Sequence, residues 1–299
     1  MKLFDRIKTF IRNIKYLSRI DLNDSEDTIL SVTKRAVAYG DLLNPSKANK
    51  IRVLDAENSL KIILNSPKSF YRYGDGEINI MRGENAGTQE YNPRLAKLLS
   101  DALCDESNSA YIGIGYEYFN FDVWGINDFA NRFYLSLEGE EYRKFYLKNC
   151  SKKVTYIDTG FTQRYFSLRE EEQDKWYSQI ESLFIGKKIK VFMGKSAYDN
   201  LDYKIYDKAD KVEYWFGPSK NAFDMYDEIL GIARKTSKDT ILCFALGATA
   251  KALIYELSKE KYLCYDIGHM AKDYDSYKKH IPINYNNAER FYTDDYKLR

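Results

Sequence analysis

The second half of the chain alternates short apolar runs with helical stretches, and this alternation limits the fold more than any other feature. The runs of strand length span Lys188–Met193, Lys211–Phe216, Thr240–Leu246 and Tyr262–Ile267. Helical patterns at Asn221–Lys235 and Ala248–Lys259 separate the last three. Strands that are joined by helical crossovers pair in parallel. The sequence therefore predicts an α/β fold with a mainly parallel sheet flanked by helices.

The first half carries similar signals. Further strands are expected at Ser69–Tyr73, Tyr111–Ile114 and Val154–Ile157. Helices are expected at Ala56–Asn65, Pro93–Cys104, Val123–Cys150 and Glu170–Phe184, the third of them broken near Gly139. We divide the chain into an N-terminal segment, residues 1–45, and one large domain, residues 46–299.

Residues 1–20 form a basic amphipathic leader with six basic residues and one acidic residue. Its apolar side chains recur at helical spacing: Leu3, Phe4, Ile7, Phe10, Ile11, Ile14 and Leu17. This pattern predicts an interfacial helix on an anionic membrane, followed by a linker to residue 45. A helix docked on the protein's own body or on a partner chain would show the same pattern.

The rest of the chain has the composition of a cytoplasmic protein. Its four cysteines are widely spaced, which argues against a disulfide framework or a zinc site. No apolar stretch reaches the ~18 residues that span a bilayer. Outside the leader, 40 basic residues face 43 acidic ones, so we expect no nucleic-acid partner. We predict a cytoplasmic location, with the leader at the inner face of the cell membrane.

Two carboxylates follow the expected strand at 69–73. Asp75 and Glu77 are separated by one glycine and preceded by Gly74. Ligands bind beyond the carboxyl ends of parallel strands, and two carboxylates that converge there suit Mg²⁺ or Mn²⁺. Such a cation would neutralise a departing diphosphate. A polar turn without a ligand explains the same residues, because Asp and Gly are common in turns.

Three other strand ends carry residues suited to a nucleotide. Gly247 ends one strand, and a helix follows with Ala248 and Thr249 at its start, where free N–H groups bind phosphate. A routine turn capped by Thr249 is the alternative. After the strand at 211–216, Lys220 offers a charge to phosphate, and its neighbours Ser219 and Asn221 offer a helix cap or a contact to a base or ribose.

His269, one of two histidines, follows the last strand. It would bind phosphate, approach the metal or orient an acceptor, whereas a lone histidine has a structural role more often.

In this order, these segments resemble the bacterial GT-D-type glycosyltransferases, whose hallmark is an Asp-x-Glu motif, here in Arg72-Tyr-Gly-Asp-Gly-Glu77. The similarity covers about residues 51–280. It continues through Tyr91–Ala96, Phe161–Tyr165, Pro218–Leu230, Ala245–Thr249 and Asp266–His269. The resemblance implies that residues 46–299 form a catalytic domain with a Rossmann-like nucleotide-sugar site.

The resemblance also implies residue roles. Asp75 and Glu77 would be the metal and diphosphate centre, with Mn²⁺ or Mg²⁺ as the cofactor. The donor, a UDP-sugar such as UDP-glucose, would contact Arg72, Lys220, Asn221, Gly247, Thr249 and His269. We add five further candidates for the donor site from the strand ends: Gly74, Gly194, Lys195, Ser219 and Ala248. The chain departs from the family pattern after the strand at 188–193, which continues as Gly194-Lys-Ser, and at Ala271, where the family tends to be acidic.

The predicted reaction is metal-dependent transfer of a sugar from a nucleoside diphosphate sugar to an acceptor hydroxyl. The acceptor would be a glycan, glycolipid or glycoprotein in bacterial surface polysaccharide or glycoprotein synthesis. An inverting enzyme needs a base, for which we name Asp273 first and Glu77 second. The alternatives are a metal-dependent nucleotide-sugar hydrolase and a non-catalytic nucleotide-binding scaffold of a polysaccharide assembly complex.

Overall fold

The computed structural model describes residues 51–119 and 137–281. The leader at residues 1–20 and the linker to residue 45 lie outside these ranges, so the membrane contact stays a prediction. Within these ranges, no helix is both long enough and apolar enough to cross a lipid bilayer.

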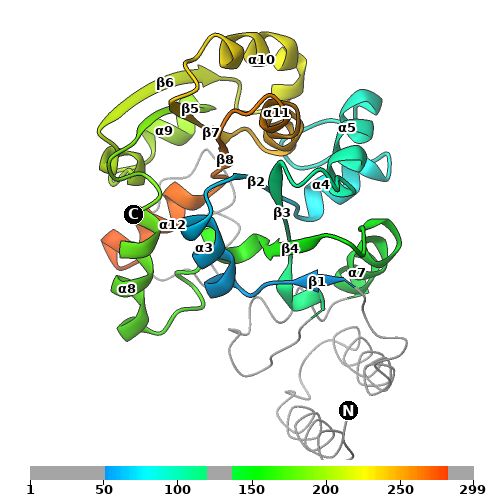
Figure 1. Cartoon of the computed structure of the whole chain (residues 1–299), viewed down its shortest axis with the longest axis horizontal. Coiled ribbons are helices and arrows are strands. Elements are labelled where there is room, and N and C mark those ends of the chain that lie inside the picture. The colour runs from blue at the N-terminus through cyan, green and yellow to red at the C-terminus, as the bar shows by residue number, and fades with distance from the viewer. Residues whose placement is uncertain (1–50, 120–136, 282–299) are drawn as a thin grey trace, which may run out of the picture.

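The described chain forms one eight-stranded sheet in the order β1-β4-β3-β2-β8-β7-β5-β6 (Figure 1). Every pair of neighbours is parallel. The strands are β1 (Arg52–Val53), β2 (Ser69–Arg72), β3 (Ala110–Ile114), β4 (Thr155–Asp158), β5 (Lys188–Gly194), β6 (Lys211–Gly217), β7 (Thr240–Ala245) and β8 (Cys264–Asp266). Because all strands run the same way, their carboxyl ends meet at one edge, where α/β proteins bind ligands.

Helices cover both faces of the sheet (Figure 1). One layer contains α4 (Asp75–Met81), α5 (Pro93–Leu103), α7 (Leu137–Asn149), α10 (Tyr226–Arg234) and α11 (Ala248–Lys259). The other contains α3 (Ala56–Asn65), α8 (Glu170–Glu181), α9 (Lys195–Asp199) and α12 (Met270–Lys279). Each layer buries its own apolar cluster, and β2 and β3 are buried along their whole length. The predicted α/β fold is confirmed.

Most elements expected from the sequence are present within a few residues of the predicted ends, and α3 and α11 match at both ends. Among the α-helices and strands of the described residues, four were not predicted: β1, α4, α9 and α12. β1 and α9 have only two and five residues, and α12 reads MAKDYDSYKK, too polar to show an apolar stripe. A long helix was expected at residues 123–150. Its first part, up to residue 136, lies outside the described residues, and α7 forms its second part.

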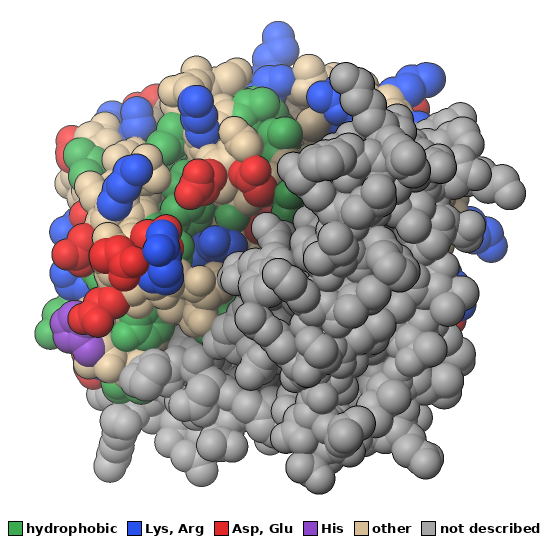
Figure 2. Space-filling view, turned by 90° about the horizontal axis from the view of Figure 1, so that it is seen from below, with side chains coloured by type: hydrophobic (Ala, Val, Ile, Leu, Met, Phe, Trp, Pro, Cys, Tyr) green, Lys and Arg blue, Asp and Glu red, His purple; other side chains and the backbone are tan. Residues whose placement is uncertain are grey.

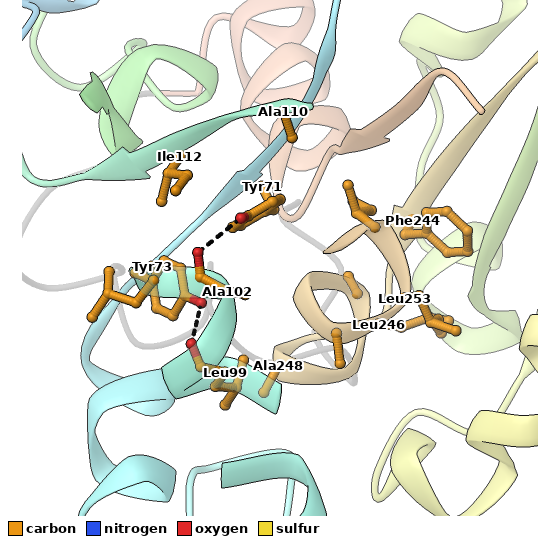
Figure 3. Close-up of a cluster of buried hydrophobic side chains, with 14 of the residues drawn as sticks. Tyr71, Tyr73, Leu99, Ala102, Ala110, Ile112, Phe244, Leu246, Ala248 and Leu253 are labelled. Carbon is orange, nitrogen blue, oxygen red and sulfur yellow. Dashed lines mark hydrogen bonds between the residues drawn. The ribbon is translucent and has the colours of Figure 1, made fainter. Parts of the chain in front are cut away.

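Two tyrosines fix the end of β2 against α5 (Figure 3). Tyr71 and Tyr73 lie on the same side of the strand and are fully buried. Their hydroxyls donate hydrogen bonds to α5 carbonyl oxygens, Tyr71 to Ala102 at 2.9 Å and Tyr73 to Leu99 at 2.6 Å. The strand end that leads into Asp75 is therefore held by packing and by hydrogen bonds.

Candidate active site

A cavity of about 750 Å³ lies at the carboxyl ends of β2, β5, β7 and β8. Its wall includes one residue at or just after each strand: Asp75, Gly194, Gly247 and His269. The volume is typical of a small-molecule site, and the position is the one that parallel sheets use for ligands.

The carboxylate pair lies at the start of a helix that the sequence did not predict, so the alternative of a simple polar turn does not describe this segment. Gly74 is the N-cap of α4, and Asp75 and Glu77 belong to its first turn. Helical residues two apart leave the axis in different directions, which does not favour the convergence of the two carboxylates that was expected from the sequence. Asp75 is exposed toward the cavity, and Glu77 is buried with 8% of its surface exposed.

The Glu77 carboxylate is engaged on both oxygens. Oε2 accepts a 2.8 Å hydrogen bond from the Gly74 N–H, and Oε1 lies 3.1 Å from the Lys251 ammonium. An acidic side chain that accepts from the N-cap amide stabilises the start of a helix. Glu77 therefore holds the backbone from which Asp75 projects.

Asp75 faces the cavity with an altered pKa. Partial loss of hydration in the concave cavity wall and the nearby Glu77 carboxylate raise the pKa of Asp75, although its side chain is open to the cavity, while hydrogen bonds from backbone amides oppose the shift. Both main causes disfavour the charged form. A cation beside Asp75 would reverse that effect, since an opposite charge favours the carboxylate.

Arg72, at the end of β2, is hydrogen-bonded to β8 and to the segment that follows β4. Its backbone N–H donates to Asp266 Oδ2 at 2.9 Å, and its guanidinium donates to Asp266 O, to the Thr159 carbonyl at 3.0 Å and to the Thr162 hydroxyl. Its Nη2 also lies 3.4 Å from Asp266 Oδ1. Arg72 lines the cavity, but most of its donors are used within the protein.

A loop at residues 83–92 forms another part of the wall, and two predicted donor residues hold it in place. Asn221 donates its backbone N–H to Thr88 O, and its side chain accepts from Glu90 N, each at 2.8 Å. The buried Gln89 carboxamide oxygen accepts from Phe223 N at 3.1 Å and lies 3.4 Å from the Thr249 hydroxyl. Asn221 and Thr249 therefore position the wall and are not part of its lining.

Gly247 joins β7 to α11 in a conformation that other residues avoid. Its φ is 54° and its ψ is −138°, and a Cβ would lie 3.0 Å from the Thr88 hydroxyl across the cavity wall. At the end of β5, a Cβ on Gly194 would lie 2.8 Å from Ser219 Oγ. Glycine at both positions lets neighbouring loops approach closely.

The structure brings eight of the predicted site residues to the cavity: Arg72, Gly74, Asp75, Glu77, Gly194, Ser219, Gly247 and His269. It leaves six outside the lining: Lys195, Lys220, Asn221, Ala248, Thr249 and Asp273. Ala248 is buried behind Gly247, and Lys195 pairs with Asp199 on the surface. Lys220 is exposed and is not part of the cavity lining.

Asp273, predicted as the base, has a structural environment. Its carboxylate accepts hydrogen bonds from Tyr177 Oη at 2.6 Å, Arg164 N at 3.1 Å and Tyr165 N at 3.3 Å, and only 1% of the residue is exposed. Burial raises the pKa of Asp273 to about 7, although these hydrogen bonds lower it. The carboxylate links α12 to α8 and to the segment before it, and it is not part of the cavity lining.

Three cavity or wall residues gave no recognisable signal in the sequence: Thr88, Gln89 and Lys251. Thr88 and Gln89 lie in a polar loop, and their roles depend on segments far away in the chain. Lys251 lies inside a helix, where a lysine is normally solvent-exposed. The only hint in the sequence is weak: Lys251 lies four residues after Gly247, close to the start of a helix.

A divalent cation fits this site with one protein ligand. Among the described residues, no group of three or more His, Cys, Asp and Glu side chains could hold a metal. Mg²⁺ is commonly bound by one or two carboxylates together with substrate phosphates. Asp75 suits that role, whereas both Glu77 oxygens already have partners.

Acidic and basic side chains are interspersed on the described part of the face that Figure 2 shows. This part of the surface carries no large patch of positive charge of the kind that favours a polyanion. The expectation of no nucleic-acid partner stays a prediction.

Two curated relatives match about three quarters of the chain. The probable glycosyl transferase Gly of Streptococcus gordonii is 26% identical over 233 residues, which are 76% of this chain and 33% of that protein. Glycosyltransferase GlyD of Streptococcus pneumoniae serotype 4 is 24% identical over 230 residues, 75% of this chain and 27% of that protein. The chain thus spans at most about a third of the length of these relatives.

Solved structures share the fold. One, described as the highly conserved domain of unknown function 1792 with a distinct glycosyltransferase fold, has a TM-score of 0.73 and 29% identity, and the match covers 84% of this chain and 91% of that chain. Another, described as a new glycosyltransferase (DUF1792) from Streptococcus sanguinis, has a TM-score of 0.74, 22% identity and coverage of 83% and 94%.

The sequence also matches the family described as "Glycosyltransferase GT-D fold" over residues 70–294. That range contains the carboxylate pair, the Gly247 turn and every strand end that lines the cavity. With most of the chain matched and the same fold in solved relatives, the chain belongs to the GT-D family of glycosyltransferases.

Proposed function

We propose that this protein transfers a sugar from a nucleoside diphosphate sugar, a UDP-sugar such as UDP-glucose, to an acceptor hydroxyl. The observation that carries the proposal is the juxtaposition of Asp75 and the Gly247 turn in one cavity at the carboxyl ends of parallel strands. Family membership supports the reaction class. The geometry supports the placement of the leaving diphosphate between these two elements.

The diphosphate is proposed to lie at the start of α11. Gly247 removes the Cβ that would block the approach, and a helix start offers N–H groups and a partial positive charge to an anion. His269 and Lys272 also line the cavity and bring further donors or charge. Fixed donors aimed at the leaving group stabilise the charge that develops as the glycosidic bond breaks.

The nucleoside is proposed to lie at the apolar end of the cavity. Phe166, Met193, Ala197 and Leu201 line this part of the wall. Tyr206 also lines it, and its buried hydroxyl has no hydrogen-bond partner among the described residues. A base edge would satisfy such a hydroxyl, and apolar walls with a few polar groups are usual in ligand sites.

A divalent cation, Mn²⁺ or Mg²⁺, is proposed to bind Asp75 together with the diphosphate oxygens. When bound, it would neutralise charge on the leaving group. Asp75 holds the ligand position, and Glu77 fixes the helix start that carries Asp75.

The acceptor is proposed to be a glycan, glycolipid or glycoprotein of the bacterial surface, reached from the cytoplasmic side of the membrane. The names of the streptococcal relatives support sugar transfer and leave the acceptor open. The leader at residues 1–20 would hold the enzyme near such an acceptor by its basic and apolar side chains.

The proposal is tested by calorimetry with UDP-, GDP-, dTDP- and CMP-sugars, each with and without Mn²⁺, followed by product analysis. We expect selective binding of UDP-sugars that Mn²⁺ strengthens, and transfer that depends on acceptor. Equal sugar release with and without acceptor would identify a hydrolase. Binding of UDP without turnover on any acceptor would identify a scaffold, and no nucleotide binding would reject the cavity as the donor site.

A further inference from the structure

Lys251 is a buried lysine in the wall of the cavity. It lies in the first turn of α11, and 7% of its side chain is exposed. Burial lowers the pKa of a lysine, but the carboxylates of Asp266 and Glu77 outweigh this effect and raise the pKa of Lys251. The side chain is thus a fixed cation beside the carboxylate pair.

All three N–H donors of the Lys251 ammonium have acceptors. Its Nζ lies 3.1 Å from Glu77 Oε1, 3.1 Å from Asp266 Oδ2 and 3.1 Å from the Gly247 carbonyl oxygen. An ammonium group has three donors, so none is left for a phosphate. Lys251 therefore links the first turn of α4, the end of β8 and the turn between β7 and α11.

The charges around Lys251 balance. Lys251 and Arg72 supply two positive charges, and Glu77 and Asp266 supply two negative ones. Asp75 is outside this network and faces the cavity. The charge of Glu77 is therefore neutralised by a neighbour, whereas the charge of Asp75, the other carboxylate of the motif, is not.

We propose that Lys251 is a positioning residue that occupies Glu77 in the unliganded protein, so that a divalent cation is held firmly only when Asp75 and the donor diphosphate bind it together. This rests on the proposed donor site. One free carboxylate is too few ligands for a cation that takes six or more oxygens, and the diphosphate supplies others. Metal and donor would then strengthen each other's binding by the same factor.

The test is titration of Mn²⁺, followed by electron paramagnetic resonance, with and without UDP. The variants are Lys251→Met and two controls, Lys272→Met and Lys259→Met. Lys272 lines the cavity and reports the through-space effect of losing one positive charge. Lys259 lies on the same helix, half-exposed and 3.6 Å from Asp105, and reports any effect of a changed helix. Unfolding temperatures are measured for all four proteins.

We expect the wild type to bind Mn²⁺ at least about tenfold more tightly with UDP than without it. In Lys251→Met, Glu77 loses the neighbouring ammonium charge of the lysine. The affinity for Mn²⁺ without UDP should then rise by about tenfold or more, well above the rise in Lys272→Met. A damaged fold cannot produce this gain, so loss of stability in the variant does not obscure the result.

Two results would overturn the inference. One is a wild type that binds UDP but whose Mn²⁺ affinity bound UDP does not change, and the other is Lys251→Met that binds Mn²⁺ no better than Lys272→Met. If Lys251→Met does not fold, the double variant Lys251→Met/Asp266→Asn is titrated instead. It removes one positive and one negative charge, so the charges of the network still balance. A wild type that does not bind UDP at all rejects the proposed function instead, because the Mn²⁺ titrations without UDP still report on Lys251.

Discussion

Gly268 lies so close to Arg72 that a Cβ on the glycine would be 2.1 Å from the guanidinium Nη2. This glycine has a φ of 41°, and it lies two residues after Asp266, the residue of β8 that accepts hydrogen bonds from Arg72. The contact explains why a glycine stands between Asp266 and His269 in this strand end. A larger residue would displace the arginine that joins β2 to β8.

Gly268→Ala should therefore destabilise the protein by about 1–3 kcal/mol, from the strained backbone alone, and by more if Arg72 must move. The measurement is urea unfolding. The matched control is Gly231→Ala in α10, where an added Cβ meets no atom within 4 Å. It should stabilise the helix by about 0.5–1 kcal/mol, so the two glycine replacements should differ in sign.

Gly247→Val should weaken UDP binding strongly. A branched side chain is strained at this φ of 54°, and its Cβ would approach the Thr88 hydroxyl in the cavity wall. Calorimetry with UDP checks this after unfolding temperatures confirm that the variant is folded. Lys220→Ala is the control, because Lys220 is exposed outside the lining. Normal UDP affinity in Gly247→Val would place the diphosphate elsewhere.

Asp273→Asn should retain transfer activity and change the pH dependence of stability. The folded protein keeps a proton on Asp273 up to a pKa of about 7, whereas an unfolded Asp releases it near pH 4. Stability from this group is therefore present at low pH and is lost as pH rises from about 4 to 7, by at most about 4 kcal/mol.

Urea unfolding of wild type and Asp273→Asn between pH 5 and pH 8 isolates this contribution, with a smaller decrease expected in the variant. Tyr177→Phe, which removes the hydroxyl that donates to Asp273, is a companion variant that should also keep activity. If Asp273→Asn folds normally but transfers no sugar, the result would support the prediction from the sequence that Asp273 is the catalytic base.

The strands could be predicted because they are short apolar runs, and β5 and β7 are the longest of those around the cavity. The helix that begins at Asp75 could not, because Gly and Asp also favour turns, so the sequence Gly-Asp-Gly-Glu fits a turn as well as a helix start. Its N-cap hydrogen bond from Gly74 to Glu77 is visible only in the structure.

The site was predictable in its strand-end glycines and its carboxylates, and less so in its side-chain network. Asn221 and Thr249 have the chemistry of nucleotide ligands, but the 83–92 loop uses both. Lys251 appears in the sequence as an ordinary helical lysine, since its carboxylate partners come from α4 and β8, far away in the chain. Pattern and composition do not encode such tertiary pairings.

The most direct test of the account is calorimetry of UDP binding to wild type and Asp75→Asn, each with and without Mn²⁺. Asp75 is the carboxylate that faces the cavity, so Mn²⁺ should strengthen UDP binding to the wild type by at least about tenfold and leave the variant almost unchanged. Both proteins should unfold at similar temperatures, because the Asp75 side chain is exposed. Equal strengthening by Mn²⁺ in both proteins would contradict the claim that Asp75 and the donor diphosphate hold the cation in this cavity.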